Sequence, residues 1–174
     1  MLGRKEQTER ILTAVADPRT TILGHMTGRQ LLRRPGCEVD ITKILRACAR
    51  HGVAVEINAN PWRLDLDWRW HQLALDLGCI MSINPDDHST SEIELTHWGV
   101  EMARKGGIPK ARVLNCMSLE EIADYLRRRR STAAPVAGRS GRQAYAARAR
   151  SPRSRAASLA RRSRNMARTA ASSG

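Results

Sequence analysis

Two side chains that could hold a metal ion follow a short apolar run near the middle of the chain. Residues 79–83 read as a buried strand, and the dipeptide Asn84-Pro85 breaks that strand at once. Asp86 and His88 come directly after the break, and side chains two positions apart in an extended segment point the same way. Carboxylate oxygen and imidazole nitrogen bind ions such as Zn²⁺ or Mn²⁺ at roughly 2.0–2.2 Å. The spacing therefore predicts a divalent metal site at the end of a strand.

The elements that must position these side chains alternate between helix and strand. Apolar spacing and helix-capping residues predict helices over residues 4–16, 41–51, 67–77, 91–105 and 118–130. Short apolar runs predict strands over residues 20–24, 53–58 and 79–84. Such alternation favours parallel strands with helices packed outside them. We therefore expect an α/β fold of about three parallel βα units.

Polar side chains end all three predicted strands. His25 follows the first strand, and Glu56 and Asn58 end the second, ahead of the Asp86 and His88 pair. The carboxyl ends of parallel strands meet at one edge of the sheet, where α/β folds place their chemistry. His25 is therefore a third candidate metal ligand. Glu56 could act near the metal or cap a neighbouring loop, and we favour the cap.

Arginines and tryptophans near these strand ends could contact a nucleic acid. Three arginines in one loop would suit a phosphate beside the metal, although a solvated surface is their other interpretation: Arg29, Arg33 and Arg34. Three tryptophans could stack on a base or belong to the core, and we assign at least the last to the core: Trp62, Trp68 and Trp70.

The charge divides the chain into two parts. The chain has 174 residues and a formal net charge of +13, with 20 of its 30 basic residues and all 17 acidic ones in residues 1–130. Residues 131–174 contain ten arginines and few large apolar side chains, so we expect a disordered basic tail. Ten arginines would bind polyanions with a strong salt dependence, whereas the alternative is an extension without function.

Cysteine spacing and hydropathy indicate the cellular compartment. The four cysteines form no Cys-x-x-Cys pair, and we expect Cys48 and Cys79 to be buried and inert. The first residues lack the apolar core of a signal peptide, and no run approaches the roughly 18 apolar residues of a membrane span. A cytoplasmic protein is the expectation.

Four motifs resemble a known family. They are LGHMTGR at residues 23–29, VEINANP at 55–61, RLDLDW at 63–68 and SINPDDHS at 82–89. In this order they resemble the PHP (polymerase and histidinol phosphatase) domain, in the version found at the C-terminus of bacterial family X DNA polymerases. The resemblance covers about residues 4–130 and does not include the tail.

The resemblance implies a distorted (β/α)₇ barrel with a cluster of manganese or zinc ions at its strand ends, acting as a 3′–5′ exonuclease and phosphoesterase. His25, Asp86 and His88 match family metal ligands, whereas Glu56 and Asn58 match a motif but are not taken as ligands. Two residues depart from the family pattern: Met26 stands where Pro is usual, and Asp87 where Ala is usual.

The resemblance also implies that part of the domain is absent. The family's His-x-His, its bridging Glu and further histidines lie on strands before the matched region. We therefore expect residues 1–130 to be the C-terminal part of a PHP domain, weakly active or inactive alone on DNA 3′ ends, with residues 131–174 as the tail.

Two other hypotheses remain open. A non-enzymatic nucleic-acid-binding protein would bind through its arginines, and its affinity would fall on deletion of residues 131–174. A split protein would regain metal binding and solubility with a separately encoded N-terminal half. The metal, the substrate and the oligomeric state are not determined by the sequence.

Overall fold

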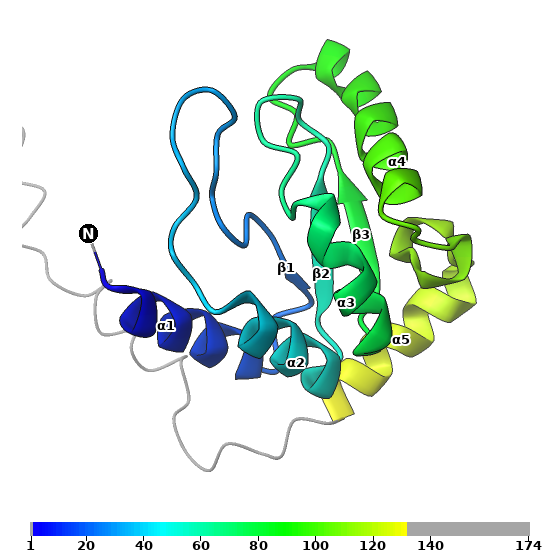
Figure 1. Cartoon of the computed structure of the whole chain (residues 1–174). Helices are drawn as coiled ribbons and strands as arrows, with labels where there is room; N and C mark the ends of the chain where they lie inside the picture. The colour runs from blue at the N-terminus through cyan, green and yellow to red at the C-terminus, as the bar shows by residue number, and fades with distance from the viewer. Residues whose placement is uncertain (1, 132–174) are drawn as a thin grey trace, which may run out of the picture. The chain divides into compact units, whose positions relative to one another are not determined.

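The computed structural model describes residues 2–131, which form a mixed α/β unit around a parallel sheet (Figure 1). The sheet has the order β1-β2-β3, from β1 (Ile22–Leu23), β2 (Ala54–Asn58) and β3 (Met81–Asn84). The register aligns Leu23 with Val55 and Val55 with Met81. The predicted parallel α/β arrangement is confirmed. These residues do not confirm a barrel, and the predicted tail lies outside them apart from Ser131.

Five α-helices connect and follow the strands: α1 (Arg4–Ala16), α2 (Ile41–His51), α3 (His71–Asp76), α4 (Thr96–Lys105) and α5 (Leu119–Ser131). Short 3₁₀ turns cover Trp68–Trp70, Thr90–Leu95, Lys110–Arg112 and Leu114–Cys116. The first two turns occupy the starts of the predicted helices 67–77 and 91–105. The α-helical parts α3 and α4 are therefore shorter than those predictions.

Local capping explains where α2 and α5 begin. Asp40 accepts the amide hydrogen of Lys43 at 3.0 Å, and Gly52 ends α2 at a φ of 65°. Ser118 and Glu121 form the predicted capping box, because each side chain accepts the other's backbone N–H, at 3.3 and 2.7 Å.

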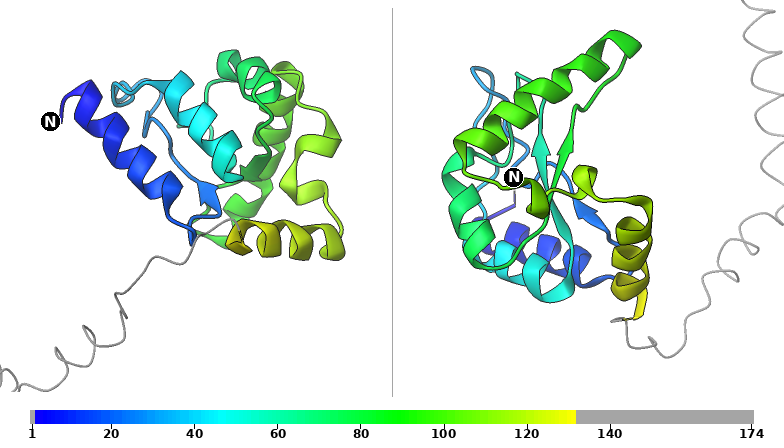
Figure 2. Two further views of the ribbon diagram at one scale, coloured as in Figure 1. Left: turned by 90° about the horizontal axis from the view of Figure 1, so that it is seen from below. Right: turned by 90° about the vertical axis from the view of Figure 1, so that its right-hand side faces the viewer.

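The core lies between the sheet and the helices. All five residues of β2 are buried, as expected for the central strand of a parallel sheet, and two of them, Glu56 and Asn58, are polar. Helices α1 and α2 lie side by side, as both views of Figure 2 show, and α4 contacts β3. The largest fully buried side chains come from α2, the strands and the loop after β2: Ile44, Leu45, Ile57, Leu66 and Met81.

One large apolar side chain of α4 lies outside this core. The apolar spacing in the predicted helix 91–105 puts Trp98 on the same stripe as Gly99 and Met102, which predicts a buried ring, but Trp98 is 44% exposed. Gly99 packs against the sheet in its place, because a Cβ there would lie 2.5 Å from Ile83 and 2.7 Å from Ala59. The helix approaches the sheet too closely for a large side chain, so the tryptophan points outward.

Helix α5 is hydrogen-bonded to the chain segments that precede β1 and β2. Arg129 is 5% exposed and donates hydrogen bonds to the backbone carbonyls of Val15, Asp17 and Thr20. The hydroxyl of Tyr125 donates to the carbonyl of Gly52 at 2.7 Å. These contacts satisfy carbonyls at the ends of α1 and α2, and so hold the described residues together as one packed unit.

Cys48 and Cys79 are buried, as predicted, and burial raises the pKa of the Cys48 thiol to about 12 and that of Cys79 to about 11. Both thiols are therefore protonated and unreactive at neutral pH. Within residues 2–131 no helix combines the length and apolar character that crossing a bilayer requires.

Candidate functional site

The ends of the three strands bring a histidine and two carboxylates close together. His25 follows β1, Glu56 lies on β2, and Asp86 follows β3. Nε2 of His25 lies 3.6 Å from Oδ1 of Asp86, and Nδ1 lies 3.6 Å from Oε2 of Glu56. Nδ1 also lies 3.2 Å from the amide nitrogen of Asn58. The shared sheet edge therefore joins residues that are far apart in the sequence.

His25 and Asp86 both adopt left-handed backbone conformations, with φ angles of 49° and 57°. Such conformations cost a non-glycine residue on the order of 1–3 kcal/mol and persist only where surrounding contacts hold them. At His25 that contact is a 2.7 Å hydrogen bond from its backbone N–H to Oε2 of Glu56. The strain lies at the two residues whose side chains approach each other across the strand ends.

Glu56 caps the loop that begins at His25. Its side chain is largely buried, and its second oxygen, Oε1, accepts a hydrogen bond from Nδ2 of Asn84 at 2.9 Å. Both carboxylate oxygens are thus occupied by protein donors, which ties the end of β1 to the end of β3 across β2. The favoured interpretation of Glu56 as a cap is confirmed.

Asp86 has a second charged neighbour. Nε of Arg63 lies 2.7 Å from Oδ2 of Asp86, and both side chains are mostly buried. Despite this contact, the buried Oδ2 makes no hydrogen bond within residues 2–131. The oxygen is therefore neutralised electrostatically but retains its capacity to accept a better-placed donor or a cation.

His88 turns toward its own loop. Its side chain is 77% exposed, with Nδ1 3.0 Å from the carbonyl oxygen of Asp86 and 3.9 Å from the carboxylate of Glu92. These contacts are local, whereas the contacts of His25 reach other strands. The structure therefore brings His25 and Asp86 together and leaves His88 at the rim.

The side chains of His25 and Asp86 could supply part of a metal-binding site. Two ligands at roughly 2.1 Å in tetrahedral geometry would be about 3.4 Å apart, close to the observed separation of 3.6 Å between His25 and Asp86. Across the described residues, no group of three or more His, Cys, Asp or Glu side chains is arranged to hold an ion. The part of the chain that the structure describes thus supplies two candidate donors and an incomplete shell.

The three predicted phosphate-binding arginines lie in the loop after β1. Arg29 donates to the carbonyls of Arg63 and Leu64 and pairs with Asp67. Hydrogen bonds from Arg69 and from Arg29 hold the pKa of Asp67 well below its usual range. Arg29 thus supports the neighbouring loop, and its role toward a phosphate stays a prediction.

The other two arginines lie farther along the same loop. The guanidinium of Arg33 lies over the ring of Trp62, and Nε of Arg34 donates to the carbonyl of Gly28 at 3.2 Å. Residues 29–36 also line a pocket of about 390 Å³. Their predicted contacts with substrate remain predictions.

Sequence reasoning missed Asp65, which organises the loop after His25. This carboxylate is 1% exposed and accepts from the backbone N–H groups of Thr27 and Gly28, both at 3.0 Å, and from the hydroxyl of Thr27 at 2.9 Å. The only signal in the sequence was an acid between two leucines in the RLDLDW motif. Arg63 belongs to the same motif, and the sequence analysis missed its role as well.

Comparison with known proteins identifies relatives that match this unit. The chain is 36% identical over 120 residues to the DNA polymerase/3′–5′ exonuclease PolX of Bacillus subtilis, a match covering 69% of this chain and 21% of that protein. It is 28% identical over 116 residues to a protein of Vibrio parahaemolyticus named as a probable phosphatase, covering 63% of this chain and 44% of that protein. No family model matches the chain.

These relatives support a relation to the PHP family. The chain spans about a fifth of the polymerase and less than half of the phosphatase. The shared region is therefore only a portion of each relative. One relative is named as an exonuclease-polymerase and the other as a probable phosphatase.

Proposed function

We propose that this chain is part of a metal-dependent phosphoesterase of the PHP type that acts on DNA 3′ ends. The observation that carries the proposal is the approach of His25 and Asp86, from different strands, to a separation of 3.6 Å between Nε2 and Oδ1. The two relatives, named as an exonuclease-polymerase and a probable phosphatase, support the same reaction class.

The chemistry that a bound Mn²⁺ or Zn²⁺ would supply is acidification of water and neutralisation of phosphoryl oxygen charge. His25 and Asp86 would hold the ion, and His88 would join them if its exposed ring turned inward. Arg63, whose Nε lies 2.7 Å from Oδ2 of Asp86, would hold that carboxylate in position. Glu56 would fix the backbone at His25, and the arginines of the loop after β1 would face the phosphate.

The described residues supply too few donors for a full metal cluster, so we propose that residues outside 2–131 or a second chain complete the site. One candidate for that second chain is the separately encoded N-terminal half of a split protein. Such a partner would contribute the remaining histidines and glutamate of the family pattern.

Titration calorimetry with Mn²⁺ tests the site in the full chain. We expect weak binding that both Asp86→Asn and His25→Gln reduce at least tenfold, whereas Glu101→Gln, at an exposed carboxylate, leaves it unchanged. Binding that survives both site substitutions would refute the metal site.

Hydrolysis of a 3′-labelled oligonucleotide with Mn²⁺ tests the activity. We expect slow turnover by the chain alone and faster turnover after addition of an N-terminal half taken from the polymerase relative. Rapid turnover by the chain alone that disappears in Asp86→Ala would show that the site is already complete.

A further inference from the structure

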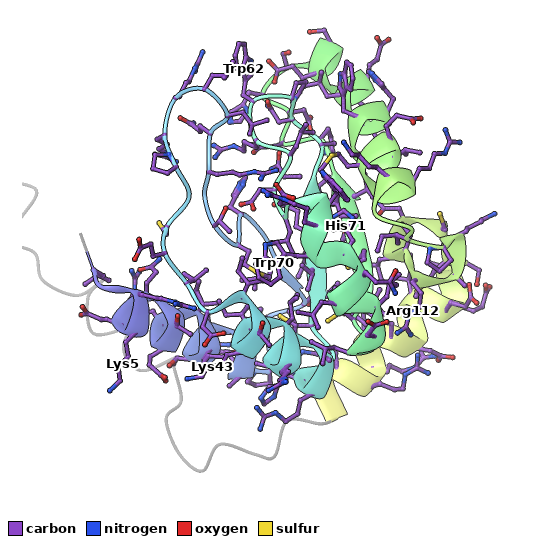
Figure 3. All side chains as sticks on the ribbon, viewed as in Figure 1. Lys5, Lys43, Trp62, Trp70, His71 and Arg112 are labelled. Atoms are coloured by element: carbon purple, nitrogen blue, oxygen red, sulfur yellow. The ribbon has the colours of Figure 1, made fainter. Side chains whose placement is uncertain are left out.

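Trp62 is an exposed aromatic ring held in place by two loops. It is 53% exposed and lies at the opposite end of the molecule from Lys5 and Lys43 (Figure 3). Its backbone carbonyl accepts the N–H of Leu31 at 2.6 Å, which joins the loop after β2 to the loop after β1. The ring is thus presented to solvent from a fixed backbone.

A cation lies over this ring. The guanidinium carbon of Arg33 is 4.6 Å from the ring centroid of Trp62, within the range of a cation–π interaction. Arg34 follows in the same loop, and residues 29–36 line the pocket of about 390 Å³. An exposed tryptophan alone is ordinary on a protein surface. An exposed aromatic ring beside two arginines is the composition of a surface that binds single-stranded nucleic acid.

The ring is also close in the chain to the candidate site. Trp62 directly precedes Arg63, whose Nε lies 2.7 Å from Oδ2 of Asp86. The side chain that pairs with the candidate ligand and the ring exposed to solvent therefore belong to consecutive residues.

We propose that Trp62 and Arg33 form a platform on which an unpaired nucleic-acid base stacks beside the candidate metal site. Arg33 and Arg34 would pair with the phosphates that flank this base. The face of a base is covered by its neighbours inside a duplex and becomes accessible in a single strand. The platform would therefore make the proposed phosphoesterase prefer single-stranded 3′ ends, and this substrate preference rests on the proposed function.

The test compares two oligomers that differ only in their bases. Fluorescence anisotropy measures the affinity of the full chain for a labelled oligo(dT) octamer and for an abasic octamer with the same number of phosphates. EDTA is present throughout, so neither metal nor hydrolysis is needed. The ten arginines of residues 131–174 would contact the phosphates of both oligomers alike, so we expect their contribution to cancel in the ratio of affinities.

We expect the unmodified chain to bind oligo(dT) about 5- to 100-fold more tightly than the abasic octamer, the range given by stacking of one base. Trp62→Ala should abolish this preference, and Trp62→Phe should retain much of it. Trp68→Ala is the matched control, because Trp68 is also exposed beneath a cation, with Nζ of Lys105 4.8 Å from its ring centroid. That variant should keep the full preference.

Equal affinity of the unmodified chain for both oligomers would overturn the platform, as would a preference that survives Trp62→Ala. If Trp62→Ala fails to fold, Arg33→Met decides instead, because it removes the cation and should lower the preference. Absence of any base preference in the unmodified chain, with intact Mn²⁺-dependent hydrolysis, would refute the platform alone. Intact preference without Mn²⁺ binding would refute the proposed function alone.

Discussion

Arg63 and Asp86 form an ion pair of 2.7 Å between Nε and Oδ2, with side-chain exposures of only 21% and 15%. The pair joins the loop after β2 to the loop after β3 at the carboxyl edge of the sheet. It sets the position of a carboxylate that also lies 3.6 Å from His25. Burial makes such a pair more strongly coupled than an exposed one, because water screens it less.

A double-mutant cycle measures this coupling. For Arg63→Gln and Asp86→Asn we expect an interaction free energy of about 1–2 kcal/mol in urea unfolding, between the values for exposed and fully buried pairs. The control is Arg104 with Glu101, which has the same 2.7 Å separation but exposures of 72% and 58%. That pair should couple by about 0.5 kcal/mol or less. Equal coupling in both pairs would contradict the role of burial.

Substitution of Asp65 tests its hold on the loop after His25. Asp65→Asn removes one of the two acceptor oxygens that serve three donors, so we expect a loss of about 2 kcal/mol in the free energy of unfolding. The amide hydrogens of Thr27 and Gly28 should also exchange faster. Asp40→Asn is the control, because asparagine caps a helix as well as aspartate does. Unchanged exchange at Thr27 and Gly28 would contradict the assignment.

Substitution of Gly99 tests the close approach of α4 to the sheet. Alanine gains about 1 kcal/mol in helix propensity, but its Cβ would overlap Ile83 and the fully buried Ala59. We expect Gly99→Ala to destabilise the fold by about 1–2 kcal/mol net, measured by urea unfolding. Glu101→Ala, at an exposed position of the same helix, should change stability far less. Stabilisation by Gly99→Ala would show that the helix shifts freely.

The buried imidazole of His71 predicts an acid sensitivity. Burial lowers the pKa of His71, and within residues 2–131 its buried Nδ1 has no hydrogen-bond partner. As the pH falls, His71 in the unfolded chain therefore binds a proton near the ordinary histidine pKa of about 6.5. In the folded chain His71 binds the proton only at a lower pH. The free energy of unfolding should fall as the pH drops below that value, because protons bind the unfolded state more readily.

Removal of the imidazole separates this effect from other titrations. In His71→Gln the decrease in stability between neutral and mildly acidic pH should be smaller than in the unmodified chain. His97→Gln, at an exposed histidine, should leave the decrease in place. An identical pH profile for all three proteins would assign the acid sensitivity to other groups.

The sequence by itself determined the local features of this protein. The cap of α2 at Asp40, the left-handed turn at Gly52 and the capping box at Ser118 and Glu121 each depend on residues within one helical turn. The alternation of helix and strand could also be predicted from the sequence, because buried strands and amphipathic helices have different apolar periods. From these followed the shared edge at which His25 and Asp86 meet.

The tertiary structure decided which partner each polar group found. Glu56 caps His25, and Asp65 holds Thr27, through contacts that span 31 and 38 positions of the chain. His88 faces its own loop, although its spacing from Asp86 predicted a shared direction, because the left-handed turn at Asp86 ends the extended geometry on which that spacing depends. Spacing along a strand predicts direction only while the strand continues, and a carboxylate's partner is set by which strands become neighbours.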